Sequence, residues 1–197
     1  MIAPSIDERK AALLVQHFGE RALLVFAWFF FETEFKDDPD KTVTSVLSIR
    51  GTSVLPTIQN ACFITTLMAT RDIDDFFTTR QTANKLKRQS NITDLKASDL
   101  GLQTDLNFLR DDERLRINKE LVHSTDRAAY GNLHDAWNIG ELTGRCVSQS
   151  LQFLDGLQSS LPPVQYDEAI AAARFFADRI REAREYVKKR LARPGLN

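Results

Sequence analysis

The amino-acid sequence predicts an all-α fold: an up-and-down helical bundle of about five helices in a single domain that spans residues 1–197. Apolar residues recur every three and four positions in several long segments, which is the spacing of one helix face. Strand signals are nearly absent, because Thr42, Val43 and Thr44 form the one β-branched run and no alternating pattern holds elsewhere. A length of 197 residues suits one compact domain.

The first helix is expected from about residue 5 to residue 35, with Ser5 and Glu8 as a capping box. Its second half, residues 25–31, is apolar on every side, so neighbours must cover more than one face. A second subunit is one candidate for such a neighbour. The charged segment that contains Pro39 ends this helix.

A second helix is expected over residues 53–77, with Pro56 in its first turn. Near its end lie Arg71, Asp72, Asp74 and Asp75, which either form surface ion pairs or orient a neighbouring helix. Residues 78–103 are polar and weakly periodic, which indicates at most a short helix and a turn.

Three further helices complete the predicted bundle. One begins near residue 104, capped by Thr104 or Asp105, and carries the segment that ends at Val122. The next begins near Trp137 and stops before two prolines at 162 and 163; its Gly140 and Gly144 are expected to let a partner helix approach closely. The last covers residues 167–193.

Composition excludes several classes of protein. The 26 basic and 27 acidic residues give a net charge of -1, which argues against coating nucleic acid by bulk charge. Cys62 and Cys146 lie in apolar helical patterns and are expected to be small buried hydrophobes rather than a disulfide. The N-terminus lacks an export signal, and the most apolar stretch, residues 22–31, is too short to span a bilayer. These features predict a cytoplasmic protein with no membrane partner.

The most concentrated chemistry lies between residues 116 and 127. At 100° per residue, Arg116, Lys119 or Glu120, His123 and Arg127 follow one helical stripe. Two cations beside an imidazole suit a phosphodiester, because the cations neutralise phosphate oxygens and histidine moves a proton near neutral pH. The alternative is a solvated helix surface with His123 favoured by the helix dipole.

No metal or other cofactor is expected. Glu120 and His123 form one Glu-x-x-His pair, whereas di-iron bundles need two such pairs. Neither zinc motifs nor the glycine-rich nucleotide motifs occur in the sequence.

The run from Asn118 to Thr125, preceded by Arg116, resembles the signature of the HEPN superfamily: an arginine, four to six intervening residues, and a histidine on a helix. It is most similar to the abortive-infection AbiU-type branch, and Arg71-Asp72 in the earlier helix is similar to another recurring feature of that branch. The arginine is followed here by Ile117, where strong nucleases commonly have a polar residue.

The resemblance implies a helical bundle that forms a homodimer, with the two arginine–histidine helices facing each other across a cleft. Active members cut RNA without metal through attack of the ribose 2′-hydroxyl on the adjacent phosphate. By position, His123 would be the general acid and base and Arg116 would stabilise phosphate charge. Asn118, Lys119 and Arg127 would bind the RNA backbone.

The leading hypothesis is therefore a metal-independent endoribonuclease of HEPN type in a defence or toxin role, with RNA as substrate and an antitoxin or other protein as a further partner. Two alternatives stay open. One is a non-catalytic HEPN-like module that binds RNA, a nucleotide or a protein partner. The other is a helical scaffold that dimerises through Trp28 and the three phenylalanines that follow it.

Overall fold

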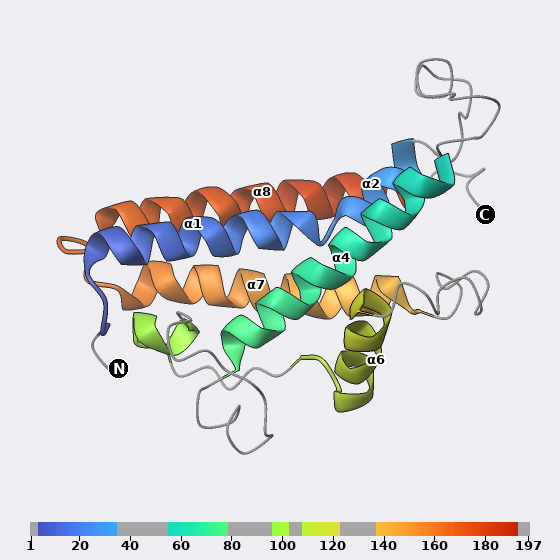
Figure 1. Cartoon of the computed structure of the whole chain (residues 1–197). Coiled ribbons are helices and arrows are strands. Elements are labelled where there is room, and N and C mark those ends of the chain that lie inside the picture. Colours follow the sequence, from blue (N-terminus) through green and yellow to red (C-terminus); the bar gives the residue numbers. More distant parts are fainter. Residues whose placement is uncertain (1–3, 35–54, 79–95, 103–107, 123–136, 193–197) are drawn as a thin grey trace.

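The computed structural model describes residues 4–34, 55–78, 96–102, 108–122 and 137–192, and side chains for all of these except 34, 55–57 and 119–122. These ranges are helical and contain no strand, which confirms the all-α prediction (Figure 1). Counting the first two elements as one broken helix, the described ranges contain five long helices, together with a short 3-10 helix, η1. The elements are α1 (Glu8–Leu24), α2 (Ala27–Glu34), α4 (Leu55–Phe77), η1 (Ala97–Leu100), α6 (Asp111–Val122), α7 (Ile139–Ser160) and α8 (Asp167–Leu191).

The long helices do not alternate strictly up and down. In Figure 1, α1 and α8 lie side by side and run in the same direction, while α4 and α7 run the opposite way. The Tyr166 hydroxyl, at the start of α8, donates to the carbonyl of Ile6, just before α1, at 3.0 Å. At the other end of the pair, the rings of Phe30 and Tyr186 lie 5.9 Å apart. The expected alternation holds between α1 and α4 and between α7 and α8.

The start of α1 differs from the predicted capping box. Asp7 is the N-cap, and its Oδ1 accepts the N–H of Lys10 at 2.9 Å. Ser5 instead pairs with η1, where its N–H donates to the carbonyl of Asp99 at 2.9 Å. Serine and aspartate are both favoured N-caps, so the local sequence allows either residue to cap α1. With Asp7 as the cap, Ser5 is available for its contact with Asp99, which is distant in the sequence.

The predicted first helix is broken at Val25 and Phe26. Thr66 of α4 supplies the reason: its hydroxyl donates to the carbonyl of Val25 at 3.3 Å and accepts the N–H of Trp28 at 3.0 Å. A side chain inserted in this way satisfies backbone groups that the break leaves without helical partners. A contact between helices therefore divides one apolar run into α1 and α2.

The apolar second half of this run is covered within the chain. Phe31 is buried, Trp28 and Phe29 are half-buried against the core, and 39% of Phe30 is exposed. Helices α4 and α8 both contact α2, so the prediction that more than one face needs a neighbour is confirmed. By length and composition, the 26-residue segment Glu8–Thr33 could cross a membrane, because an 18-residue window within it reaches a mean hydropathy of 1.2. In the fold, 33% of that window is buried.

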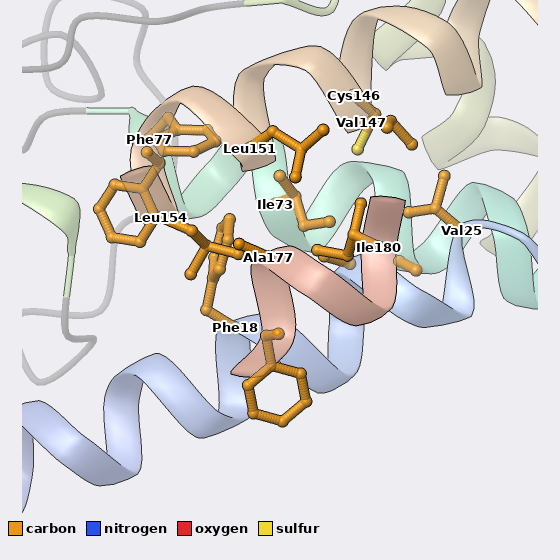
Figure 2. Packing of buried hydrophobic residues seen from close by; sticks show 14 of the residues in the cluster. Phe18, Val25, Ile73, Phe77, Cys146, Val147, Leu151, Leu154, Ala177 and Ile180 are labelled. Carbon is orange, nitrogen blue, oxygen red and sulfur yellow. The ribbon is translucent and has the colours of Figure 1, made fainter. Parts of the chain in front are cut away.

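The core joins α1, α4, α7 and α8. Figure 2 shows Phe18, Phe77 and Leu154 among its members. The rings of Phe18 and Phe153 have centroids 4.7 Å apart, and those of Phe77 and Phe153 are 5.4 Å apart in an edge-to-face arrangement. Such pairs add about 0.5–1.5 kcal/mol each beyond their buried area.

The glycines that permit close helix packing are not those predicted. A Cβ at Gly144 would meet nothing within 4 Å, and one at Gly140 would meet a single atom at 3.8 Å. A Cβ at Gly19 of α1, in contrast, would lie 2.1 Å from the ring of Phe176 of α8. The close approach therefore occurs between α1 and α8.

The helix boundaries elsewhere follow the sequence closely. Helices α4, α7 and α8 begin and end within a few residues of the predictions, whereas α6 begins at Asp111 rather than near residue 104. Residues 103–107, which include both predicted caps, lie outside the described part. Both cysteines are free thiols. Cys146 is buried and Cys62 is half-buried, and burial raises the pKa of each thiol.

Candidate functional site

Helix α6 carries the predicted arginine and is anchored to α4 by a buried ion pair. Asp74 is fully buried, and its carboxylate contacts the guanidinium of Arg114, whose side chain is 8% exposed. The Oδ1 atom of Asp74 also accepts the N–H of Leu109, at 3.0 Å, just before α6 begins. One carboxylate thus holds both the first turn of α6 and the segment that leads into it. Figure 1 shows α6 beside α4 and near the start of α7.

A second buried carboxylate ties α6 to α7. The Oε1 atom of Glu113 contacts Arg145 of α7, and its Oε2 atom accepts the N–H of Arg110 at 2.9 Å. Arg145 also donates to the carbonyl of Phe108 at 2.8 Å. Since Glu113 is the third helical residue and bonds back to Arg110, it also completes half of a capping box. The sequence locates α6, and these contacts set its orientation.

The anchored helix directs Arg116 toward a pocket between α6 and the start of α7. The guanidinium carbon of Arg116 lies 4.3 Å from the centroid of the Trp137 ring, within the range of a cation–π interaction. The pocket has a volume of about 210 Å³. Beside Arg116 and Trp137 it is bordered by Asp112, Asn138 and Glu141.

The charges around the pocket nearly balance. Arg110 and Arg116 face the carboxylates of Asp112, Glu113 and Glu141. Arg110 lies 3.6 Å from Asp112 and 3.0 Å from Glu113. The pocket therefore combines an aromatic ring and guanidinium groups with carboxylate acceptors, which differs from a purely basic surface for phosphate.

The predicted site residues are only partly brought together. Arg116 borders the pocket, while Asn118 lies on a different side of α6, since residues two positions apart on a helix do not face each other. Asn118 is half-buried, and its Oδ1 atom has no hydrogen-bond partner among the described residues. The side chain of Lys119 lies outside the described part, as do His123 and Arg127.

The fold explains why position 117 is isoleucine, where the resembled signature commonly has a polar residue. Its side chain is fully buried and belongs to the core cluster. On α6 it shares the inward side with Arg114, three residues earlier. A polar side chain at position 117 would be buried in the apolar core, where burial without a hydrogen bond is unfavourable. Isoleucine therefore fits the orientation in which α6 packs.

The sequence left two roles open for the acidic residues of α4, surface ion pairs or the orientation of a neighbouring helix, and the structure shows both. Arg71 lies 3.4 Å from Asp75, and Arg21 of α1 lies 3.5 Å from Asp72, in partly exposed ion pairs. Burial is the main cause of a raised pKa at Asp72. Asp74, in contrast, orients α6 through Arg114. The side of α4 on which each carboxylate falls decides its role.

Trp137 is the site residue that sequence reasoning missed. The sequence placed it in the apolar stripe of the following helix, but α7 begins at Ile139 with Asn138 as its N-cap. An aromatic residue just ahead of the N-cap does not belong to the apolar stripe of the helix. The place of Trp137 directly before Asn138 was therefore the signal in the sequence that this ring could serve another purpose. Within the described ranges, no group of three or more metal-ligating side chains is found.

Comparison with known proteins adds no relative. No protein-family model, no curated protein and no solved structure matches the chain. The HEPN resemblance therefore remains a prediction based on the residues from Arg116 to Thr125 and on the Arg71-Asp72 pair.

Proposed function

We propose that the chain is a metal-independent endoribonuclease of HEPN type in a defence or toxin role. The observation that carries this proposal is the placement of Arg116 at an open pocket on a helix whose orientation is held by two buried carboxylates. A guanidinium held in place before substrate binds stabilises charge in the transition state without further reorganisation. Trp137 restricts the guanidinium through their stacking contact.

His123 is the proposed proton-transfer residue. Positions seven apart on an ideal helix project from nearly the same side, which would direct an imidazole at 123 and the guanidinium at 116 to one substrate. The imidazole accepts the proton of the ribose 2′-hydroxyl, whose oxygen bonds to the adjacent phosphorus. The bond from phosphorus to the 5′ oxygen breaks, and that oxygen receives a proton. The products are a 2′,3′-cyclic phosphate and a 5′-hydroxyl end.

Cleavage of structured RNA in EDTA tests this mechanism. We expect His123→Ala to lower the rate by about 10²–10⁴-fold and Arg116→Ala by about 10²–10³-fold, with cyclic phosphate ends on the wild-type product. Arg179→Ala is the matched control, because Arg179 also stacks on an aromatic ring, Phe175, at 5.4 Å, but lies on α8. Equal cleavage by wild type and His123→Ala, or no cleavage by folded wild type, would contradict the proposal.

The proposed active form is a homodimer, as the family resemblance implies. Sedimentation equilibrium of the wild type measures its mass directly, and a monomer at assay concentrations would contradict this part of the proposal. Phe30→Glu tests the alternative contact surface: Phe30 is partly exposed and contacts Tyr186, so an unchanged mass would assign this ring to the fold of one subunit.

The second candidate function is a non-catalytic module that binds RNA, a nucleotide or a protein partner such as an antitoxin. The carboxylates beside Arg116 favour it, because they offset the attraction of the pocket for phosphate. RNA binding that survives His123→Ala, with no cleaved product from the wild type, would support this function over the ribonuclease.

A further inference from the structure

The Trp137 pocket has the dimensions and surface chemistry of a site for a single planar ring system. Its volume of about 210 Å³ is below the range of about 300–1,000 Å³ typical of sites for drug-sized ligands. Two of its borders, Trp137 and the Arg116 guanidinium, are planar and lie in contact. Proteins bind unpaired nucleobases by stacking them on aromatic rings and on guanidinium planes.

The hydrogen-bonding groups at the pocket distinguish among the four bases. Asp112 comes from α6 and Glu141 from α7, with side chains 77% and 52% exposed. The Oε2 atom of Glu141 accepts the side-chain N–H of Asn138 at 3.1 Å, and its Oε1 atom lies 3.8 Å from Arg145. Asp112 lies 3.6 Å from Arg110. An ionised carboxylate offers about four lone-pair sites, so each retains capacity to accept further hydrogen bonds.

Guanine is the base that fits acceptors of this kind. Its Watson–Crick edge presents two adjacent donors, the N1–H and the N2 amino group, which match the two oxygens of one carboxylate. Adenine, cytosine and uracil each place an acceptor beside their donor, and that acceptor would face a carboxylate oxygen. Arginine is in turn a frequent partner of the guanine O6 and N7 atoms, and Arg110 lies at the same pocket.

We infer that this pocket binds a guanine base, stacked on the Trp137–Arg116 pair, with a carboxylate of Asp112 or Glu141 accepting the N1–H and N2–H bonds. The inference rests on the proposed function insofar as it assigns guanine-containing single-stranded RNA as the substrate class. The ribonuclease would then cut near an unpaired guanosine rather than at any exposed phosphodiester.

Tryptophan fluorescence tests the binding directly. The chain has two tryptophans, so Trp28→Phe leaves Trp137 as the one reporter. We titrate this variant with the 5′-monophosphates of guanosine, adenosine, cytidine and uridine. The expected result is saturable quenching by guanosine monophosphate with affinity on the order of tenfold above the other three. No quenching, or equal quenching by all four, overturns the inference.

Charge-neutral variants identify the recognition group. Asp112→Asn and Glu141→Gln each replace one acceptor oxygen by a donor, so the guanosine preference should be lost in at least one of them. Glu182→Gln is the matched control, because Glu182 is an exposed carboxylate on α8 that pairs with Arg179. A preference retained in both pocket variants, or lost equally in the control, overturns the inference.

The two proposals fail separately. Cleavage of RNA that depends on His123, without guanosine monophosphate binding, removes the guanine pocket and retains the ribonuclease. Saturable and selective binding of guanosine monophosphate by a folded chain that cuts no RNA retains the pocket and removes the ribonuclease.

Discussion

Helix α6 and the α1–α8 pair are held in the fold by different physical means. Between α1 and α8 the buried side chains are mostly small or apolar, and the backbones approach so closely that Phe176 lies over Gly19. On α6, Ile117 is fully buried, but Glu113 and Arg114 are buried with it. Their partners, Arg145 and Asp74, come from α7 and α4.

The comparison shows that apolar packing can hold the α1–α8 pair while ion pairs set the orientation of the helix that carries the candidate site. Apolar burial is roughly proportional to area and has no direction, so it suits helices that must simply pack. Ion pairs with several hydrogen bonds are directional, and they determine which side of a helix faces outward. The charged contacts of α6 therefore direct Arg116 toward Trp137. A single substitution is expected to disrupt these contacts more than it disrupts the apolar packing of α1 and α8.

The largest effect is expected from Asp74→Asn. The amide retains an oxygen for the N–H of Leu109, but it leaves the buried Arg114 charge without its partner. Removing one member of a buried pair costs about 3–5 kcal/mol. Chemical denaturation measures this loss, and adding Arg114→Met should recover most of it because no charge then remains buried. A single variant as stable as wild type would show that the pair does not hold α6.

Gly19→Ala should destabilise the α1–α8 pair by about 1–3 kcal/mol, since the new methyl group would overlap the ring of Phe176. Gly144→Ala provides the contrast within α7, where the methyl group meets no atom within 4 Å. There the loss of backbone freedom in the unfolded chain should stabilise the fold by about 0.5–1 kcal/mol. Thermal melts compare the two, and shifts of the same sign would refute the distinction.

An exposed ion pair should matter far less than the buried one. Arg181 of α8 donates to both oxygens of Asp155 of α7 at 2.7 Å, but both side chains are more than 40% exposed. We expect Asp155→Asn to cost less than about 1 kcal/mol, because water screens the pair. If Asp155→Asn lowers the free energy of unfolding as much as Asp74→Asn does, burial is not the reason for the larger contribution of the Asp74 contact.

The smallest effect concerns the charged end of the α1–α8 pair. A hydrogen bond with Asp167, together with the negative charges of Asp167 and Glu168, raises the pKa of Glu8 above its ordinary value of 4.5. The native state therefore binds this proton more tightly than the unfolded chain, and the associated stability is lost as pH rises through the raised pKa. The stability of Glu8→Gln relative to wild type should increase from acidic to neutral pH.

Asp7→Asn should show the opposite pH dependence in the same denaturation series. The N–H and side chain of Lys10 lower the pKa of Asp7, so its contribution is present at neutral pH and is lost as pH falls through the lowered value. Parallel pH profiles for the two variants would contradict these opposed assignments.

Much of the fold was readable from local patterns. The three-and-four apolar spacing located α4, α7 and α8, and the two prolines after Leu161 marked the end of α7. These signals succeed because helix formation and its interruption depend on residues within a turn or two of each other. The stripe from Arg116 to Arg127 was predicted from the same periodicity; the described helix α6 covers it as far as Val122, and its chemistry stays a proposal.

Tertiary structure alone decided which residues meet. No local pattern shows that Thr66 inserts at Val25, that Gly19 rather than Gly144 lies under a neighbouring ring, or that Asp74 is the buried member of its acidic run. The Arg116–Trp137 contact likewise joins α6 to the residue just ahead of the N-cap of α7, and the packing of the two helices sets the distance. Periodicity specifies which face of a helix is apolar, whereas the partner of each side chain depends on the positions of distant segments, and these follow from packing the whole chain.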